Sequence, residues 1–351
     1  MRRHPYKKQS LDRCHSRTHQ KTHEKTSFKP PLKLPRGPVM CGVESLTLTE
    51  NDLRRLSHPL VGGVILFARN VKSRHQLRAL CDHIHAIRTP PLVIGIDQEG
   101  GRVQRLRAPR FKTLPPMGSI RKRHSEKNKA CLAAFRLGRR LAAELIDLSI
   151  DFSFAPVLDI DYGKSAVIGN RSFGEDFHVV SLLAGGFCRG LRSFGVATVG
   201  KHFPGHGFVE ADSHTEMPED TRDFFDISLD MAPYLVISDH LTSVMMAHVR
   251  YPNHDKMPAG FSSFWINDVL RGKLKFTGLV FSDDLGMVGA HSVGDWVARA
   301  NAAFIAGCDV VLACNEFDAI DDLLTRWKPV YSEDRFNMLQ KRWSQMTKRS
   351  S

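Results

Sequence analysis

Eight short apolar runs that alternate with helical stretches constrain the fold of this 351-residue chain more than any other feature. Each run is rich in Val, Ile, Leu or Phe and is bounded by Gly, Pro, Asn or Asp, as strands are. The runs are continuously apolar, which is typical of parallel strands buried on both faces. They cover residues 37–43, 61–67, 92–97, 152–160, 196–203, 243–249, 279–285 and 309–314.

The segments between the runs predict helices, and Ser262 and Ser292 are candidate N-caps. The helices are expected at 72–88, 126–149, 177–195, 262–272 and 292–307. Eight strands interleaved with helices is the count that closes a (β/α)8 barrel of the TIM type. The alternative, an open doubly wound sheet, normally carries a glycine-rich phosphate turn after its first strand, and residues 44–47 (ESLT) contain none. We therefore expect one α/β domain, a single (β/α)8 barrel, over residues 36–351.

The chain carries a formal net charge of +13, but most of this charge lies at its start. Residues 1–36 hold eleven Lys or Arg and two acids, a formal +9 that leaves +4 for the rest. Residues 1–35 have few apolar side chains, several prolines and no periodicity, so we expect a disordered basic extension. Non-specific contact with polyanions and a mitochondrial transit peptide are the functional alternatives, and the apolar core of a secretory signal is missing.

Composition excludes several other classes of protein. No window approaches the ~18 to 20 apolar residues of a membrane-spanning helix, so no membrane association is expected. The seven cysteines are scattered without a C-x-x-C pair, which indicates a reduced, cytosolic chain. Nothing indicates an obligate interface, so a monomer is expected, and the body gives no sign of specific nucleic-acid binding.

Polar and ionisable residues follow nearly every apolar run, at the strand ends where a barrel of this type carries its active site. Groups that could hold a sugar by its hydroxyls occur among them, since they include both donors and acceptors. These are Asp97, Arg105, Arg171, Lys201 and His202.

Three further residues could perform glycoside hydrolysis. Asp283 is a candidate nucleophile, and His214 can give and take a proton near neutral pH. Asp212 can orient the imidazole of His214. Asp284 is expected to face away from Asp283 because strand side chains alternate, and Glu99 is expected to brace a loop or contact a hydroxyl.

Two other functions compete with this one. A metal-dependent hydrolase could bind zinc through Asp283 and several imidazoles, those of His202, His206, His214 and His248. His206 is instead expected to be structural, and the glycosidase interpretation requires neither metal nor cofactor. A nucleic-acid-binding protein could use the basic extension, but this would not explain the residues at the strand ends.

Five motifs carry a resemblance to a known family. They are DQEGGRVQR at 97–105, NRSF at 170–173, KHFPGHG at 201–207, DSH at 212–214 and FSDDL at 281–285. Their types and order resemble the family 3 glycoside hydrolases, specifically bacterial β-N-acetylhexosaminidases of the NagZ type, over residues 37 to 345.

The resemblance implies a barrel without a second domain and retaining hydrolysis through a glycosyl-enzyme. It implies Asp283 as nucleophile, His214 as proton donor and acceptor, and sugar contacts from Asp97, Arg105, Arg171, Lys201 and His202. It further implies a cytoplasmic enzyme of cell-wall recycling that removes N-acetylglucosamine from muropeptides. The extension at 1–35 has no counterpart in the family pattern.

Overall fold

The structure is a computed structural model that describes residues 1, 31–107, 109, 111–210 and 217–347. The chain divides into two units, Met1–Pro30 and Pro31–Ser351. Apart from Met1, the first unit lies outside the described residues. Most of the segment predicted as a disordered extension, residues 1–35, therefore also lies outside them. The fold described below is that of the second unit.

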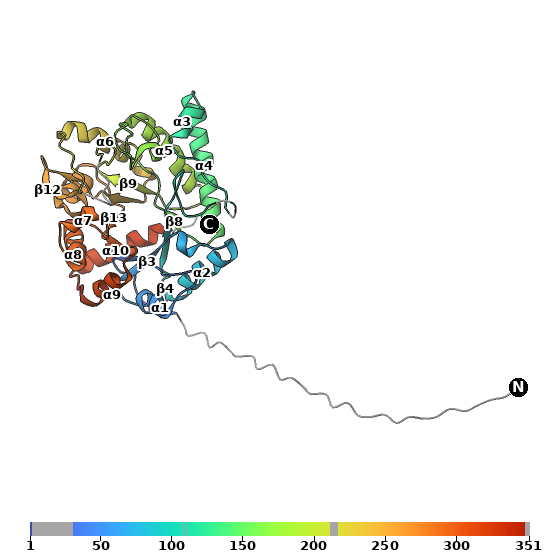
Figure 1. The fold of residues 1–351 in the computed structure, drawn as a ribbon. Helices are drawn as coiled ribbons and strands as arrows, with labels where there is room; N and C mark the ends of the chain where they lie inside the picture. Colours follow the sequence, from blue (N-terminus) through green and yellow to red (C-terminus); the bar gives the residue numbers. More distant parts are fainter. Residues whose placement is uncertain (2–30, 108, 110, 211–216, 348–351) are drawn as a thin grey trace. The chain divides into compact units, whose positions relative to one another are not determined.

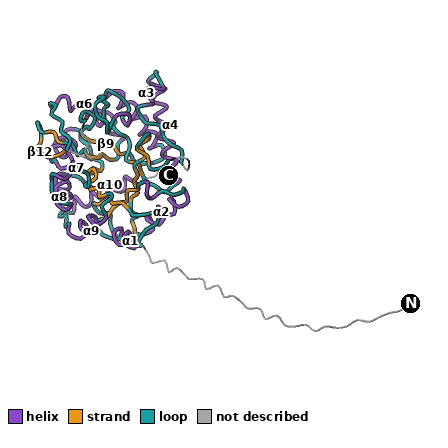
Figure 2. The backbone as a smooth tube through the Cα atoms, in the orientation of Figure 1, coloured by secondary structure: helices purple, strands orange, loops and turns teal. Residues whose placement is uncertain are grey.

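An eight-stranded sheet of parallel neighbours forms the centre of the fold, and helices surround it (Figures 1 and 2). The order of the strands is β8-β5-β3-β2-β14-β13-β10-β9. Parallel bridges from Phe152 to Ala197 and from Val157 to Lys201 join the two ends of this order. The predicted single (β/α)8 barrel is therefore confirmed.

Each of the eight apolar runs supplies one strand of the barrel. The strands are β2 (Val39–Gly42), β3 (Val61–Leu66), β5 (Val93–Ile96), β8 (Phe152–Ser153), β9 (Val199–Phe203), β10 (Ser243–Met246), β13 (Leu279–Asp284) and β14 (Val310–Ala313). The run at 152–160 gives the shortest of them. Beyond Ser153 the run continues as an extended segment that bonds to the β9 region, with the amide of Leu158 donating to the carbonyl of Lys201 at 2.7 Å.

Helices form in all five predicted segments. They are α2 (Arg74–Ala86), α4 (Lys127–Asp147), α5 (Phe177–Arg192), the π-helical segment η5 (Phe264–Lys273) and α8 (Trp296–Ala306). The N-cap predicted at Ser292 is wrong, because Asp295 caps α8 by accepting from the amide of Ala298. Ser262 precedes η5, and its hydroxyl accepts from the amide of Trp265 at 3.2 Å.

Helices α4 and α5 pack together through glycine. A methyl group on Gly138 would lie 2.2 Å from the carbonyl oxygen of Phe187, and one on Gly190 would lie 2.2 Å from that of Phe135. Such approaches exclude any side chain, so these two glycines set the close spacing of the helices. The other α-helices of the described residues are α1 (Glu50–Leu56), α3 (Ser119–Arg123), α6 (Phe224–Val236), α7 (Val288–His291), α9 (Phe317–Arg326) and α10 (Glu333–Met346).

The folded unit begins before residue 36. The short strand β1 (Leu32–Lys33) pairs in parallel with β4 (Arg88–Thr89). The buried guanidinium of Arg88 donates to the carbonyl of Pro35 and, at 2.8 Å, to that of Val61. Backbone pairing and this buried donor hold the segment from Leu32 onward against the barrel, where apolar content alone gave no signal.

The interior of the barrel is filled by large apolar side chains, among them three phenylalanines in mutual contact. The ring centroids of Phe152 and Phe154 lie 4.9 Å apart, and those of Phe154 and Phe281 lie 5.4 Å apart. Helix α10 adds Trp343, which packs edge-on to Phe281 and donates from Nε1 to the carbonyl of Gly37 at 3.0 Å. Because Gly37 precedes β2, Trp343 closes the amino-terminal end of the barrel.

No helix in the described part of the chain combines the length and apolar character that crossing a membrane requires.

Replacing Trp343 by Ala should lower the free energy of unfolding by ~3 to 5 kcal/mol, because it empties a fully buried site at the barrel's end. Trp343→Phe keeps a ring and loses the bond to Gly37, and should cost less, with about 1 kcal/mol from the hydrogen bond. Denaturant unfolding of both variants measures this. Lys341→Ala, an exposed change in the same helix, is the matched control. Equal losses of unfolding free energy in all three variants would contradict the role of Trp343 in closing the barrel.

Candidate functional site

A cavity of about 430 Å³ opens at the carboxyl ends of the strands. Seven of the eight strands, or the residues just after them, line it, which is the position expected of an active site in this fold. One representative from each is Ile65, Asp97, Phe154, Lys201, Met245, Asp283 and Leu312. Of the candidate residues within the described part of the chain, all six border this cavity: Asp97, Arg105, Arg171, Lys201, His202 and Asp283.

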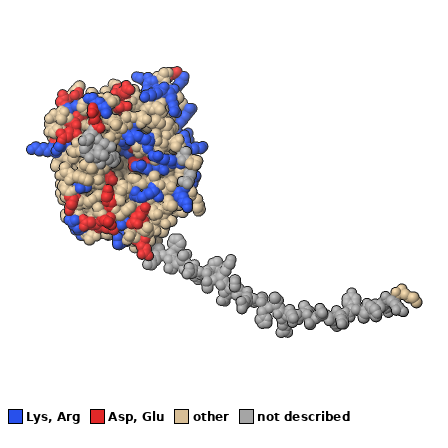
Figure 3. Space-filling model, viewed as in Figure 1, with Lys and Arg blue, Asp and Glu red and all other residues tan. Residues whose placement is uncertain are grey.

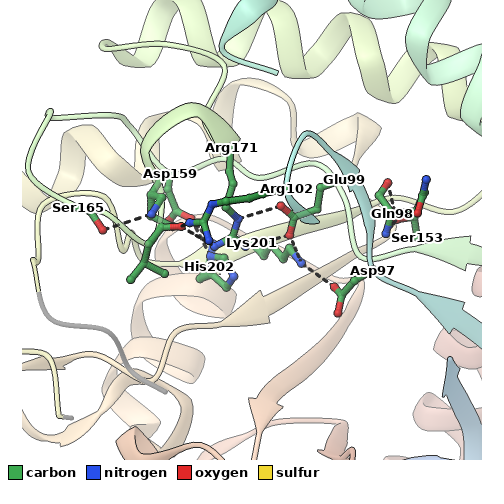
Figure 4. Close-up of polar contacts among 12 residues, drawn as sticks. Asp97, Gln98, Glu99, Arg102, Ser153, Asp159, Ser165, Arg171, Lys201 and His202 are labelled. Atoms are coloured by element: carbon green, nitrogen blue, oxygen red, sulfur yellow. Dashed lines mark hydrogen bonds and ion pairs between the residues drawn. The ribbon is translucent and has the colours of Figure 1, made fainter. Parts of the chain in front are cut away.

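A network of charged side chains forms one wall of the cavity (Figure 4). Lys201 lies between two carboxylates, with its Nζ 3.0 Å from Asp97 Oδ1 and 2.6 Å from Glu99 Oε1. Arg171 binds Glu99 in a two-point contact, with both N–O distances at 2.9 Å. Arg105 completes the network through Nη2, 3.1 Å from Asp97 Oδ2. The residues come from β9, from the hairpin after β5 and from the loop after β8.

The network keeps its buried members ionised. Burial raises the pKa of Glu99, but Arg171 and Lys201 outweigh burial, so the pKa lies well below its usual value. The pKa of Asp97 is likewise lowered, since Lys201 and Arg105 outweigh its burial. Burial lowers the pKa of Lys201, yet Asp97 and Glu99 raise it overall. Glu99 is thus a fixed anion that positions two cations, in line with the predicted bracing role.

A second contact orients His202. Its Nδ1 lies 2.7 Å from Asp159 Oδ2, and Asp159 also accepts from the amides of His202 and His206. Burial raises the pKa of Asp159, but the neighbouring His202 outweighs it and the pKa is lowered. A carboxylate at Nδ1 leaves Nε2 as the ring nitrogen available for a ligand. Asp159 lies near the end of the apolar run at 152–160, and no role is predicted for it from the sequence.

His206 lies beside His202, with the two ring centroids 6.0 Å apart. It is buried and lines the cavity. Burial, with a contribution from His202, lowers the pKa of His206 to about 4, so the ring is neutral near pH 7. Its amide donates to Asp159 at 2.7 Å, which agrees with the structural role predicted for this loop residue.

Asp283 and Asp284 both border the cavity, so the expectation that Asp284 faces away is wrong. The pairing of β13 with β14 shifts register between Phe281 and Asp284, and such a bulge breaks the alternation of side chains. Asp284 Oδ1 accepts from the amides of Gly286 and Cys314, each at 3.2 Å. Burial raises the pKa of Asp284 to about 7.

Two predicted catalytic residues, Asp212 and His214, lie outside the described residues. His248, one of the imidazoles of the metal alternative, is buried, stacks on Phe261 at 5.0 Å and has Nε2 3.2 Å from the carbonyl of Asp284. Among residues 31–107, 109, 111–210 and 217–347, no group of three or more His, Cys, Asp or Glu is arranged to hold a metal ion.

Comparisons with known proteins agree with this geometry. The model of the glycosyl hydrolase family 3 N-terminal domain matches residues 39–342. A beta-hexosaminidase from Bordetella avium is 54% identical over 299 residues, which cover 84% of this chain and 85% of that protein.

Solved structures give the same result. The crystal structure of native NagZ from Neisseria gonorrhoeae shares 43% identity at a TM-score of 0.85, with 91% of this chain and 92% of that chain covered. The same protein in complex with N-trifluoroacetyl-D-glucosamine shares 44% identity at a TM-score of 0.84, with the same coverage.

Asp284→Asn should change how stability depends on pH. The pKa of an Asp in the unfolded chain is ~3.9, whereas burial raises that of Asp284 to about 7. Between these values the folded state keeps a proton that the unfolded state has lost, so rising pH lowers the free energy of unfolding. Asparagine cannot ionise, so the variant should gain stability relative to the parent between pH 4 and pH 7.

Denaturant midpoints measured across this range test the prediction. Asp268→Asn, which removes an exposed carboxylate from η5, is the control. If the stability of the parent and of Asp284→Asn changed with pH in parallel, the buried carboxyl of Asp284 would not contribute to the pH dependence of stability.

Proposed function

Because this chain belongs to glycosyl hydrolase family 3, we propose that it is a retaining exo-β-N-acetylglucosaminidase acting on cell-wall muropeptides. It would release terminal N-acetylglucosamine from GlcNAc-anhydro-N-acetylmuramic acid, with or without the peptide stem. This assigns it to peptidoglycan recycling in the cytoplasm. The observation that carries the proposal is a cavity that combines a wall of ionised hydroxyl-binding groups with Asp283 at the end of β13.

The sugar would be held by the wall. Asp97 accepts hydrogen bonds from hydroxyls, while Arg105, Arg171, Lys201 and His202 supply donors, so vicinal hydroxyls find both partners. The network already fixes these side chains, and binding therefore costs little side-chain entropy. The Neisseria protein's complex with a glucosamine derivative supports an amino sugar as the ligand of this cavity.

The chemistry would proceed in two steps. A carboxylate oxygen of Asp283 attacks the anomeric carbon, the glycosidic bond breaks, and His214 protonates the departing oxygen. His214 then takes a proton from water, the water oxygen attacks the anomeric carbon, and the bond to Asp283 breaks. Two inversions give net retention. Asp212 would orient the imidazole and stabilise its charge.

An alternative mechanism uses the acetamido oxygen of the substrate as the nucleophile, with a pair of enzyme carboxyl groups nearby. Asp283 and Asp284 both border the cavity, so position alone does not distinguish the two mechanisms. The contacts of Asp284 favour direct attack by Asp283, because backbone amides of Gly286 and Cys314 hold the Asp284 carboxyl.

Substrate class is tested with paired chromogenic β-glycosides. We expect kcat/KM for the N-acetylglucosaminide to exceed that for the glucoside at least about a hundredfold, because a site built for a polar group discriminates against its absence. Asp283→Asn should abolish both activities, which shows that they arise at one site. Equal turnover of the two glycosides by the parent protein would rule out the proposed specificity.

A covalent intermediate is expected on Asp283. Enzyme quenched during turnover of a glycoside with slow deglycosylation should carry a sugar-sized mass on the peptide that contains Asp283. The variant Asp283→Asn should carry none. Absence of the adduct in the parent, together with strong inhibition by a thiazoline that mimics the acetamido-derived intermediate, would instead support substrate assistance.

A further inference from the structure

Arg102 lies at the mouth of the cavity and has no role in the steps above. It is exposed and sits between the two short strands of a hairpin, β6 (Gln98–Gly100) and β7 (Val103–Gln104). Gly101, just before it, has a φ of 58°, which favours glycine. Lys201, at the inner end of the same wall, is 3% exposed. An exo-acting enzyme binds the terminal sugar deep in the cavity, so Arg102 is placed at the level of the leaving group.

Charge on this wall exceeds what its own carboxylates neutralise. Arg105, Arg171 and Lys201 share two anions, Asp97 and Glu99. Arg102 adds a fourth cation and forms no ion pair with a carboxylate of residues 31–107, 109, 111–210 or 217–347. In Figure 3 Lys and Arg side chains gather beside the central hollow. A neutral sugar supplies no charge to match this excess.

The charged residues also have a defined position relative to Asp283. Asp97 and Glu99 follow β5, and Asp283 ends β13. In the closed order of eight strands β5 and β13 are four places apart either way, so they lie on opposite sides of the barrel. Asp97, Glu99 and the hairpin that carries Arg102 therefore lie across the cavity from Asp283.

Arg102 is held in place before any ligand binds. Its Nη2 donates to the carbonyl of Ala166 at 3.0 Å and to that of Val167. Arg171 donates to the same Val167 carbonyl at 3.0 Å, so both arginines brace one loop (Figure 4). These contacts use Nη2, so the N–H groups of Nη1 remain to donate a charge-assisted hydrogen bond to a carboxylate.

We propose that Arg102 binds a carboxylate on the aglycone and makes this chain selective for anionic leaving groups. This inference rests on the proposed glycosidase function and specifies its substrate further. Two carboxylates could fill the role, that of the lactyl ether on the aglycone sugar and those of an attached peptide. An arginine fixed by backbone carbonyls recognises either of them through the same geometry.

The test compares selectivity in Arg102→Gln with that in the parent. Selectivity is the ratio of kcat/KM for a GlcNAc disaccharide with a free lactyl carboxylate to kcat/KM for its methyl ester. We expect the ratio to fall about tenfold in the variant, equivalent to about 1.4 kcal/mol, and to recover in part in Arg102→Lys. Lys112→Gln removes an equal charge from an exposed position outside the cavity and should leave the ratio unchanged.

A second pair of substrates locates the carboxylate. In these the lactyl group is in amide linkage to a peptide whose carboxylates are either free or amidated. For each pair the ratio is kcat/KM of the substrate with free carboxylates over that of the blocked one. A fall of this ratio in Arg102→Gln for the first pair assigns Arg102 to the lactyl group, and a fall for the second pair assigns it to the peptide. Unchanged ratios in both pairs, or an equal fall in Lys112→Gln, would overturn the inference. Failure of the parent to cleave any β-N-acetylglucosaminide would instead overturn the proposed function itself.

Discussion

The contact of Lys201 with Asp97 and Glu99 is the interaction on which the rest of the cavity depends. An ammonium group this deeply buried is tolerated only when carboxylates pair with it, and the carboxylates require the same in return. The contact also joins β9 to the hairpin after β5, and through Glu99 it reaches Arg171 in the loop after β8. Three separate segments thus share one electrostatic arrangement, which fixes the donors and acceptors before a ligand arrives.

The barrel itself could be predicted from sequence because burial on both faces leaves an unambiguous pattern. All eight runs become strands, and residues at or just after the ends of seven of them meet around one cavity. The role of Asp159 was missed because its partner, His202, is 43 residues away and sequence patterns report neighbours only. The start of the folded unit was misplaced for a similar reason, since β1 is stabilised by pairing with β4 and not by apolar content.

Alternation of side chains failed at the residues where function would be expected. It predicts opposite faces for Asp283 and Asp284, and the shifted register of β13 brings both to the cavity. Bulges are common next to active sites, since they redirect side chains that a regular strand would point elsewhere. A rule based on ideal strand geometry is therefore least reliable at the ends of barrel strands.

The bond between Trp343 and the carbonyl of Gly37 has a consequence for biosynthesis. Its partners are 306 residues apart, and β14 likewise pairs with β2 across most of the chain. Contacts of such sequence separation form slowly, because a long loop must close before they contribute. While α10 remains inside the ribosome, the nascent barrel lacks Trp343 at its amino-terminal end, and the pairing of β14 with β2 is not yet secured. The apolar lining of the early strands is then exposed to solvent, and partly folded chains in this condition are prone to aggregate.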